Sequence, residues 1–539
     1  MKLSYAGIQE RAAWERAGIT LPSFNWEDMR RCTVQSPVWL HFGAGNIFRG
    51  FIAGLQQDLL EQGLVQAGIL AAEAFDYDLI DKIYDPFDCM TLMVSLGADG
   101  GMEKTVIASI AACLRAGRAY PQDMEALQEA VRNPSLQMIS FTITEKGYGL
   151  RDMRGDYLPV VQRDFRSGPS ACGHTMCVVA SLLLERFRAG ARPIAVVSMD
   201  NCSRNGEKLR SSVLEVVSHW RDNGLVPEAF ADWINDETKV AFPWSMIDKI
   251  TPRPSPEVEA CLTAAGLEDM KPIVTGKNTF IAPFVNAETC QYLVIEDNFP
   301  NGRPPLERAG VYMTDRETVN KTEQMKVLTC LNPLHTALAV FGCTLGFTRI
   351  ADEMRDGDLR TLVTRMGYEE GMKVVVDPEI IQPEDFIREV IGERFPNAFI
   401  PDSPQRIATD TSQKVSIRLG ETIRAYARRS DLEVTALRFI PLVIAGWLRY
   451  LLGVDDEGQP IECSSDPLLE ELQRKLKGIH FGDAAPDLDI LDSILSSQQI
   501  FGLDLVQAGL SGTIREMFRQ MIRGPGAVRR TLHQHVITQ

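Results

Sequence analysis

The stretch Val38-Trp39-Leu40-His41-Phe42-Gly43-Ala44-Gly45-Asn46 decides the fold of the first half of this chain. Its first five residues read as a short buried strand, its two glycines as a tight turn, and residues 52–63 as the helix that follows. In such a strand, turn and helix the backbone can approach a pyrophosphate at the helix N-terminus. Because this GxG pattern is short, an ordinary tight turn is an equally good interpretation of these residues taken alone.

Short apolar runs continue along the first half of the chain. They predict strands at residues 68–72, 90–95, 137–143, 193–198 and 292–296. Helical periodicity lies between them, most clearly at residues 175–188. This alternation of strands and helices predicts an α/β, Rossmann-like domain with a doubly wound parallel sheet.

The second half reads differently, because strand-like runs become scarce and long amphipathic stretches dominate. These stretches predict helices at residues 336–347, 358–368, 413–427, 432–452 and 466–476. We therefore expect a dinucleotide-binding Rossmann-like domain at residues 1–314 and an all-helical substrate and catalytic domain at residues 315–539.

Composition excludes several classes of protein. The formal net charge of −16 over 539 residues argues against nucleic acid, which requires concentrated positive charge. We find no apolar run that approaches the roughly 20 residues of a membrane span, so we expect no membrane-spanning helix. The N-terminus turns polar too early for a secretory signal, which favours a cytoplasmic protein. The 11 cysteines form no CxxC pair, so we read them as reduced thiols and expect no metal site.

A second informative stretch is Glu323-Gln-Met-Lys326-Val-Leu-Thr-Cys-Leu-Asn332-Pro-Leu-His335. It places a potential general base, an amide and an imidazole in mostly apolar surroundings, which can tune a lysine for proton exchange with an alcohol. Pro333 favours a new helix with Asn332 as its N-cap and His335 in its first turn. An ordinary Glu–Lys pair on a surface helix is the alternative interpretation.

Several motifs occur in an order that resembles one family of enzymes. They are Gly43-Ala-Gly-Asn-Ile-Phe-Arg49, Thr142-Ile-Thr-Glu-Lys-Gly-Tyr148, Ser198-Met-Asp-Asn-Cys-Ser-Arg-Asn-Gly206, Met246-Ile-Asp-Lys-Ile-Thr-Pro252, residues 326–335 and Arg406-Ile-Ala-Thr-Asp-Thr-Ser-Gln-Lys414. Together they span nearly the whole chain and resemble the long-chain polyol and sugar-acid dehydrogenases of the mannitol dehydrogenase family. The resemblance implies a metal-independent oxidoreductase that interconverts a secondary alcohol and a ketone on an open-chain sugar derivative.

By this resemblance, Lys326 acts as the general base in oxidation and as the general acid in reduction. Asn201 and Asn332 would stabilise charge on the reacting oxygen. His335 would orient a hydroxyl group, and Glu323 would connect the lysine to solvent. In the family the lysine precedes the asparagine by one residue fewer, so this chain has one inserted position between them. A turn asparagine and a histidine that merely packs are the alternative interpretations of Asn201 and His335.

Substrate contacts are implied at Asp248, Arg406 and Lys414. A guanidinium group binds a carboxylate through two parallel hydrogen bonds, so Arg406 suits a sugar acid. The same pair of cations also occurs in the polyol enzymes and does not choose between the two substrate classes. Solvated surface charges are the alternative interpretation of all three residues.

Cofactor contacts are implied by the glycine-turn motif and by the motif at residues 142–148. The residues are Gly43, Gly45, Asn46, Phe48, Arg49, Thr144 and Glu145. An acidic residue after the second strand binds the ribose hydroxyls of NAD and disfavours the 2′-phosphate of NADP. Glu73 continues directly from that strand and is preferred to Asp76, so we expect NAD as the cofactor.

D-mannonate and D-fructuronate are the substrates that we expect first, because the C-terminal half resembles the sugar-acid branch of the family. Mannitol with fructose, the reaction of mannitol 2-dehydrogenase, comes next, followed by the tagaturonate reductase reaction. The inserted residue keeps open a protein of a different class, a catalytically inactive NAD-binding sensor. The sequence does not define the oligomeric state.

Overall fold

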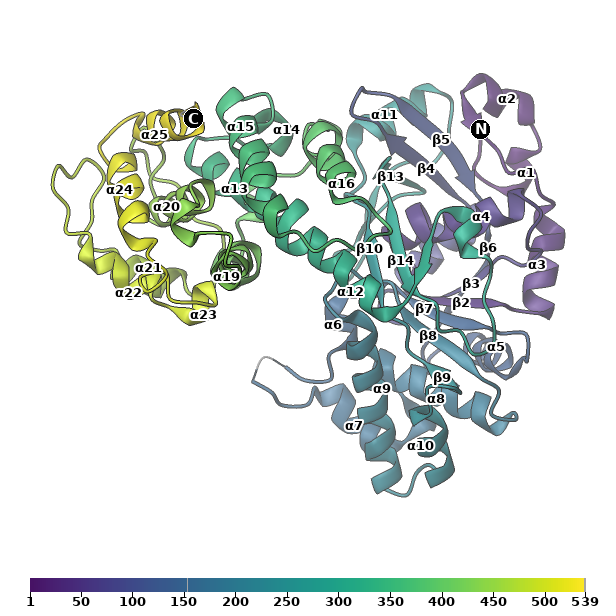
Figure 1. Cartoon of the computed structure of the whole chain (residues 1–539). Helices are drawn as coiled ribbons and strands as arrows, with labels where there is room; N and C mark the ends of the chain where they lie inside the picture. Colours follow the sequence, from purple (N-terminus) through teal and green to yellow (C-terminus); the bar gives the residue numbers. More distant parts are fainter. Residues whose placement is uncertain (153, 538–539) are drawn as a thin grey trace. The chain divides into compact units, whose positions relative to one another are not determined.

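The chain forms two compact units (Figure 1). The computed structural model describes residues 1–152 and 154–537. The first unit contains Met1–Gly97 and Gly101–Asn320, and the second contains Ala98–Gly100 and Lys321–Gln539. Strands and helices build the first unit and helices build the second, which confirms the predicted Rossmann-like domain followed by a helical one.

A six-stranded parallel sheet is the centre of the first unit. Its order is β6 (Ile110–Arg115), β3 (Ile69–Glu73), β2 (Trp39–Phe42), β7 (Met138–Phe141), β8 (Ile194–Ser198) and β9 (Val240–Ala241). Every residue of β2, β3, β7 and β8 is buried, as expected for parallel strands covered on both faces. The carboxyl ends of β3, β2 and β7 therefore lie side by side.

Helices connect these strands. The helix after the glycine turn contains a π-helical segment, η1 (Phe48–Ile52), and continues as α4 (Ala53–Glu61). Helix α8 (Thr175–Arg188) has the bounds that its periodicity predicts. It packs against α5 (Pro121–Arg132) and α9 (Asn205–Asp222), and its buried apolar side chains belong to the core.

The prediction that the strand at residues 90–95 belongs to the parallel sheet is wrong. The strand forms as β4 (Thr91–Leu96), but it pairs antiparallel with β5 (Met102–Ile107) in a separate four-stranded sheet. A short turn connects the two strands, in which the N–H of Gly97 donates to the carbonyl of Gly101 at 2.9 Å. A parallel neighbour would instead need a long crossover connection. The position beside β3 is occupied instead by β6, which the apolar runs did not reveal.

Two smaller sheets complete the first unit. The predicted late strand is β14 (Tyr292–Glu296), which lies between β10 (Ser245–Asp248) and β15 (Tyr312–Thr314) in a three-stranded sheet. Strands β11 (Ile273–Val274) and β12 (Phe280–Ile281) form a short hairpin.

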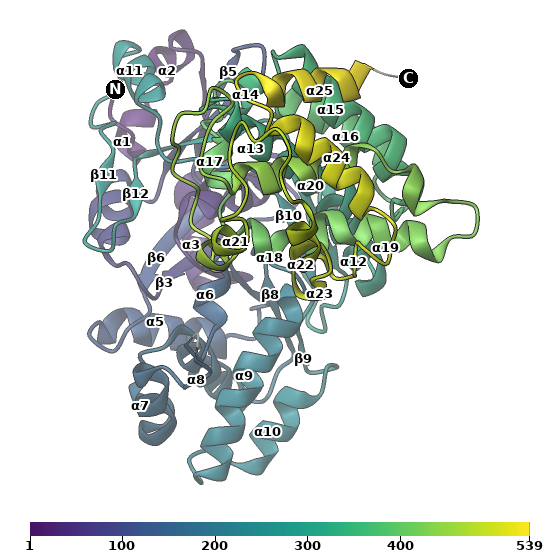
Figure 2. The same ribbon diagram turned by 90° about the vertical axis from the view of Figure 1, so that its left-hand side faces the viewer.

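Two apolar helices, α13 (Asn332–Thr344) and α20 (Phe439–Tyr450), form the core of the second unit. Every residue of α20 is buried, and α20 packs against α13 and α24 (Ser511–Met521) (Figure 2). The other predicted helices correspond to α15 (Gly357–Arg365), α18 (Thr411–Val415), α19 (Glu421–Arg428) and α21 (Leu469–Lys475). No β-strand occurs among the described residues of this unit.

One continuous helical stretch, Arg316–Thr344, is long and apolar enough to cross a membrane by length and composition alone. The sequence analysis overlooked it, although residues 327–344 contain no charged side chain. Its most apolar window is 72% buried inside the structure. Burial of this kind is typical of a core helix, whose apolar surface is covered by its own protein.

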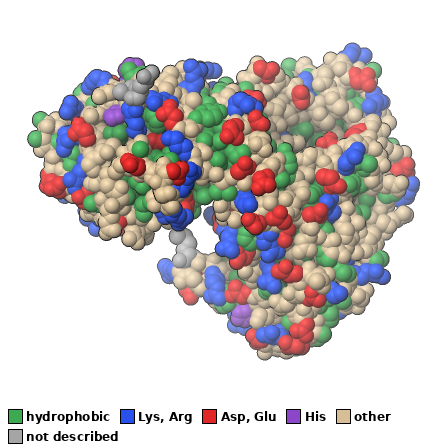
Figure 3. Space-filling view, in the orientation of Figure 1, with side chains coloured by type: hydrophobic (Ala, Val, Ile, Leu, Met, Phe, Trp, Pro, Cys, Tyr) green, Lys and Arg blue, Asp and Glu red, His purple; other side chains and the backbone are tan. Residues whose placement is uncertain are grey.

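Charged side chains of both signs are interspersed on the face of the molecule seen in Figure 3. Lysines and arginines there lie next to aspartates and glutamates rather than forming one continuous basic surface.

Arg186 forms hydrogen bonds to the backbone near the beginnings of two central strands. The side chain lies in α8 and is only 1% exposed. Its guanidinium donates to five backbone carbonyls, those of Val131, Asn133, Leu136, Arg192 and Pro193, at 2.8–3.1 Å. Leu136 lies two residues before β7 and Pro193 immediately before β8, so a single side chain connects the beginnings of both strands.

Replacing Arg186 with lysine tests this role. A lysine has three donors and cannot reach all five carbonyls, and each buried carbonyl left unpaired costs about 1–3 kcal/mol. We expect Arg186→Lys to lower the free energy of unfolding of the first unit by about 3 kcal/mol, measured by urea unfolding with tryptophan fluorescence. The matched control is Arg188→Lys on the same helix, whose side chain is 58% exposed and pairs with Glu185; it should change stability by less than about 0.5 kcal/mol. Equal effects of the two substitutions would contradict the assignment.

Candidate functional site

Gly43 occupies a position that only glycine fits. Its φ is +104°, and a Cβ atom there would lie 2.2 Å from the carbonyl oxygen of Thr142. Its N–H donates to the carbonyl of Ala72 at 2.9 Å, so the turn is held between the ends of β3 and β7. At Gly45, by contrast, a Cβ atom would meet no atom within 4 Å. The backbone at Gly45 is therefore open to close approach by a ligand.

A cavity of about 550 Å³ lies next to this turn, at the carboxyl ends of β2, β3 and β7. Doubly wound sheets bind nucleotides at this edge. Four residues predicted to contact the cofactor line the cavity, namely Gly43, Gly45, Glu73 and Thr144. Its wall also includes Phe75, Asp76, His174 and Thr279. The size of the cavity, its position and the clamped glycine fit a dinucleotide.

The other predicted cofactor residues do not line this cavity. Phe48 is fully buried and stacks on His41 with ring centroids 4.1 Å apart. Arg49 is also fully buried; it donates to the carbonyl of Ala282 at 2.9 Å and to Asn46 Oδ1 at 2.9 Å. The structure therefore uses Asn46 and Arg49 to fix the segment after the turn. Glu145 forms an ion pair with Lys208 of α9.

Glu73 forms part of the cavity wall and is 7% exposed. Its carboxylate accepts hydrogen bonds from the backbone N–H groups of Ala44 at 3.0 Å, Phe75 at 2.8 Å and Asp76 at 3.1 Å. Burial raises the pKa of Glu73, and these hydrogen bonds oppose the shift. Asp76 accepts from Thr275 and Thr279 at 2.6 Å each, which ties the β11–β12 hairpin to the rim of the cavity. Glu73 thus joins the end of β3 to the glycine turn.

Asp200, which the sequence analysis did not select, organises the loop after β7. It follows β8 and accepts from the N–H groups of Ile143 and Thr144 at 2.9 Å each and from the hydroxyl of Tyr148 at 2.6 Å. These bonds hold Thr144 at a φ of +64° beside the cavity. Burial raises the pKa of Asp200, while the bond from Tyr148 lowers it. Its position at the end of a buried strand was the available signal.

The remaining predicted residues of the first unit lie near strand ends. Asn201 is exposed in the loop after β8, and Asp248 ends β10 and is 6% exposed. Among the residues that the structure describes, no group of three or more His, Cys, Asp or Glu side chains is arranged to hold a metal ion.

Lys326 lies in a π-helical segment of the second unit, η6 (Met325–Cys330), and is 2% exposed. The segment continues directly from α12 (Arg316–Gln324), which contains Glu323 one turn earlier. The N–H of Leu331 donates to the carbonyl of Lys326 at 3.1 Å, a bond that spans five residues rather than four. A π-turn of this kind accommodates one extra residue within a helix, as the inserted position that the resemblance implies between Lys326 and Asn332 would require.

The prediction that Asn332 is an N-cap is wrong by one residue. Helix α13 begins at Asn332 itself, with Leu331 at the N-cap position and no side-chain cap. Leu331 separates α13 from η6 with a non-helical φ of −126°, and its own N–H donates back to the carbonyl of Lys326. His335 does lie in the first turn, and its N–H donates to the carbonyl of Leu331 at 3.0 Å.

His335 and Arg406 share a carboxylate that the sequence analysis missed. The Nε2 atom of His335 lies 3.1 Å from Oδ2 of Asp402. The Nε and Nη2 atoms of Arg406 donate to Oδ1 of Asp402 at 2.8 and 2.6 Å. Burial lowers the pKa of His335, and the charge of Asp402 opposes this shift. The spacing of four residues between Asp402 and Arg406 was the available signal.

Lys414 lies near a further cation, Arg418, which the sequence analysis also missed. Burial and the charge of Arg418 lower the pKa of Lys414, and burial lowers the pKa of Arg418 to about 10. Lys414 donates to the carbonyl of Thr409, and Arg418 donates to the hydroxyl of Thr336 at 2.9 Å. Within the described part of the chain, no carboxylate forms an ion pair with either cation. The two partly buried charges therefore suit an anionic ligand.

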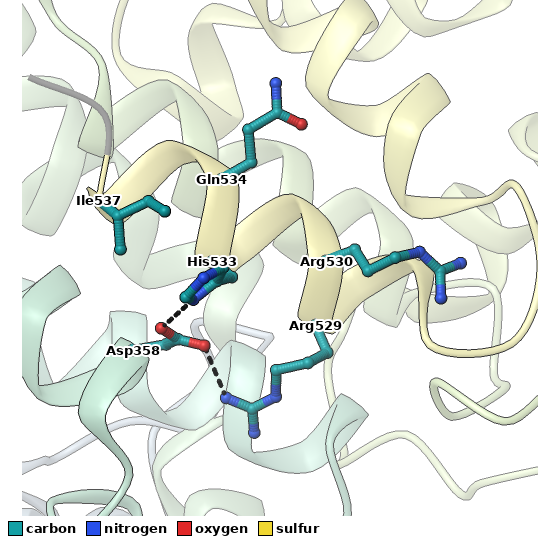
Figure 4. A pocket seen from close by; sticks show the side chains of 6 residues that line it. All are labelled: Asp358, Arg529, Arg530, His533, Gln534 and Ile537. Carbon is teal, nitrogen blue, oxygen red and sulfur yellow. Dashed lines mark hydrogen bonds and ion pairs between the residues drawn. The ribbon is translucent and has the colours of Figure 1, made fainter.

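A basic depression elsewhere in this unit provides a contrast. It lies on α25 (Ala527–Ile537), and in Figure 4 Arg529 and His533 both point to Asp358. Arg529 also pairs with Asp356 at 2.8 Å, and His533 Nδ1 lies 2.8 Å from Asp358 Oδ1. Because these groups are already neutralised by carboxylates, the depression offers less to an anion than Lys414 and Arg418 do.

The glycine turn allows a direct test of the dinucleotide site. In Gly43→Ala the positive φ alone costs about 1–3 kcal/mol, and Thr142 must also move, so we expect NADH affinity to fall by roughly 10- to 100-fold in a fluorescence titration. Gly54→Ala, in an open position of α4, is the matched control and should leave NADH affinity unchanged. Gly45→Ala should weaken NADH binding without lowering the unfolding midpoint. Unchanged affinity in Gly43→Ala would exclude this site.

The chain matches the sequence profiles of two protein domains. The mannitol dehydrogenase Rossmann domain matches residues 38–308, and the mannitol dehydrogenase C-terminal domain matches residues 318–522. The chain is 54% identical over 538 residues to D-mannonate oxidoreductase of Thermotoga maritima, which covers 99% of both chains.

Solved structures of related enzymes have the same fold. Mannitol 2-dehydrogenase of Pseudomonas fluorescens, in a ternary complex with NAD and D-mannitol, is 25% identical with a TM-score of 0.71 and covers 99% of both chains. Substrate-free D-sorbitol dehydrogenase is 26% identical with a TM-score of 0.77, covering 96% of this chain and 98% of its own. With both domain profiles and a full-length relative in agreement, the chain belongs to the mannitol dehydrogenase family of NAD-dependent oxidoreductases that act on CH–OH groups.

Proposed function

We propose that this protein is an NAD-dependent oxidoreductase that interconverts D-mannonate and D-fructuronate. The main support is the 54% identity with a D-mannonate oxidoreductase over 99% of both chains. The pair of partly buried cations at Lys414 and Arg418 supports an acid substrate independently of that identity.

The cofactor residues that we propose are those of the cavity wall. Gly43 and Gly45 would bring the backbone to the pyrophosphate, and Glu73 would bind the ribose hydroxyls and disfavour a 2′-phosphate. Thr144, held at the rim through Asp200, would contact the same cofactor. NAD supplies the hydride acceptor, and NADH the hydride donor, when bound.

The catalytic role that we propose for Lys326 is proton transfer. In oxidation it takes the proton of the substrate hydroxyl, and in reduction it returns a proton to the carbonyl oxygen. The amides of Asn201 and Asn332 donate hydrogen bonds to that oxygen and stabilise its developing charge. Glu323, partly exposed one turn before the lysine, exchanges the proton with solvent, and His335 orients a substrate hydroxyl.

The substrate contacts that we propose favour a carboxylate. Arg406 is largely neutralised by Asp402, with which it forms an ion pair. Lys414 and Arg418 retain positive charge that an anion can neutralise, and a charge-assisted hydrogen bond is roughly twice as strong as a neutral one. A sugar acid would use this charge and a polyol would not. Asp248 completes the proposed set as a contact for substrate hydroxyls.

We further propose that residues 1–314 and 315–539 divide cofactor binding from substrate binding and catalysis. The reaction would need no metal, and the protein would be cytoplasmic. Dialysis against a chelator should then leave the activity unchanged, whereas loss of activity restored by zinc would contradict a metal-independent reaction.

Substrate choice is tested by following NADH oxidation with fructuronate, tagaturonate and fructose at matched concentrations. We expect fructuronate to have the highest kcat/KM, by at least about 100-fold over fructose, because an ionic contact supplies roughly 3 kcal/mol.

The catalytic role of Lys326 is tested by substitution. In Lys326→Ala we expect kcat to fall by about 10³-fold with NADH affinity retained. Lys373→Ala, at an exposed position of the same unit, is the control.

The other outcomes of this assay are informative. A preference for fructose would make the protein a mannitol 2-dehydrogenase, and a preference for tagaturonate would make it a tagaturonate reductase. Binding of NADH without turnover of any of the three substrates would indicate a catalytically inactive sensor. The inserted residue between Lys326 and Asn332 would then be the first place to look for the cause of the lost activity.

Arg418 gives a specific test of the acid substrate. In Arg418→Met we expect kcat/KM for fructuronate to fall by about 100-fold, while that for fructose changes by less than about threefold, because only the uronate has a carboxylate. The control is Arg428→Met, at an exposed position of α19. A parallel loss with both substrates would show that Arg418 maintains the structure rather than selecting the substrate.

A further inference from the structure

Asp402 lies in the connection before α17 (Pro404–Ile407) and is 7% exposed. Its backbone is fixed on both sides. The N–H of Ile350 donates to its carbonyl at 3.0 Å, and its own N–H donates to the carbonyl of Ile400 at 2.8 Å. A carboxylate on a backbone held in this way has a defined position from which to orient other side chains.

The two oxygens of Asp402 hold two different functional groups. Oδ1 accepts two hydrogen bonds from Arg406, at 2.8 and 2.6 Å. Oδ2 lies 3.1 Å from Nε2 of His335, whose ring lies against Phe395 with centroids 4.9 Å apart. The imidazole and the guanidinium are therefore positioned by one carboxylate.

The charges around Asp402 define its protonation state. Burial raises the pKa of Asp402, but the nearby His335 and the charge of Arg406 outweigh burial and hold that pKa below its usual range. Burial lowers the pKa of His335, and the charges of Arg418 and Arg406 lower it further, against the effect of Asp402. At neutral pH the pair is thus a carboxylate and a neutral imidazole.

Glu353 lies in the same buried region but does not compete for this role. It ends α14 (Ile350–Glu353), is fully buried, and fits against α13 where a Cβ atom on Gly342 would lie 2.1 Å from its Oε1. Its carboxyl oxygens find no hydrogen-bond partner in the described structure. Burial, and next the charge of Asp402, raise the pKa of Glu353 to about 9. Glu353 is therefore neutral, and Asp402 bears the charge.

Oδ2 of Asp402 accepts no hydrogen bond in the described structure. A neutral imidazole whose Nε2 lies 3.1 Å from a carboxylate oxygen nevertheless avoids repulsion between lone pairs by carrying its proton on that nitrogen. The Nδ1 atom is then left with a lone pair, which makes His335 a hydrogen-bond acceptor toward a substrate hydroxyl. Oδ1 of the same carboxylate accepts two hydrogen bonds from Arg406, which restrict the rotation of a side chain that is 66% exposed.

We propose that Asp402 is a positioning residue of the reaction, which holds His335 in its Nε2-protonated form and aligns Arg406 for the substrate. The assignment rests on the proposed function for the roles of these two partners. Asp402 links the roles of His335 and Arg406, because a change at Asp402 affects both the orientation of the reacting hydroxyl and the binding of the sugar chain.

The substitution Asp402→Asn separates this role from simple packing. An amide has the shape of the carboxylate but only one acceptor oxygen, and its NH2 group faces a donor on the other side. Its oxygen can satisfy Arg406, but its NH2 group then faces His335, which pairs with it only by moving the proton from Nε2 to Nδ1. We expect a rise in KM for fructuronate together with a fall in kcat, and a loss in kcat/KM of about 10²-fold. Asp385→Asn, in an exposed ion pair with Arg388, is the matched control and should have no effect.

Double-substitution cycles identify the partners. If Asp402 acts through His335 and Arg406, combining Asp402→Asn with His335→Ala or Arg406→Ala will cost much less than the product of the separate effects. Multiplicative losses in both cycles would overturn the proposal.

Nuclear magnetic resonance of the protein labelled with ¹⁵N-histidine provides a measurement that needs no turnover. His335→Gln identifies the signal among the seven histidines. We expect the Nε2–H tautomer in wild type at pH 7 and a further lowered pKa of His335 in Asp402→Asn. An Nδ1–H tautomer in wild type would overturn the proposal. Absence of activity toward all uronates with the expected tautomer present would instead contradict the proposed function.

Discussion

The contact between the glycine turn and the end of β7 is the constraint on which the first unit depends. Gly43 lies so close to the carbonyl of Thr142 that a side chain cannot be placed there. This contact, together with the bond from Gly43 to the carbonyl of Ala72, brings three strand ends to one point. The cavity lies next to that point, with Gly43 and Gly45 in its wall. Glu73 and Asp200 then use buried carboxylates to fix the loops on either side.

Buried arginines in this protein fall into two groups according to their partners. Arg49, Arg186 and Arg449 are fully buried or nearly so, and each donates to backbone carbonyls that lie far away in the sequence or at strand starts. Such arginines connect distant parts of the backbone through the carbonyls that accept from them. Arg418 donates to a threonine hydroxyl, which leaves its charge available. In an acidic protein, the local arrangement of cations matters more for an anionic substrate than the total charge.

Local patterns were sufficient to predict the elements that depend on local physics. The strand before Gly43, the helix at Thr175–Arg188 and the helical second half follow from periodicity and turn chemistry, and the structure confirms them. The sheet to which β4 belongs depends on a hairpin partner, and the apolar pattern of the strand does not encode that choice. Asp402 and Arg418 were missed for a related reason, because their importance comes from His335 and Thr336, more than sixty residues earlier in the chain. Arg49 shows the opposite case, since its motif suggested a ligand contact whereas the structure gives it carbonyl partners.

The π-turn that contains Lys326 has a consequence for how related sequences are compared. A helix that widens by one residue over one turn lets the chain gain a position while the segments before and after it keep their directions. Evolution can therefore change the spacing between a lysine and a following asparagine without dismantling the helix that presents them. A gap in an alignment at such a place records a change in helix type rather than the loss of a functional group. Searches that require a fixed spacing between these two residues would overlook members of a lineage that retain both.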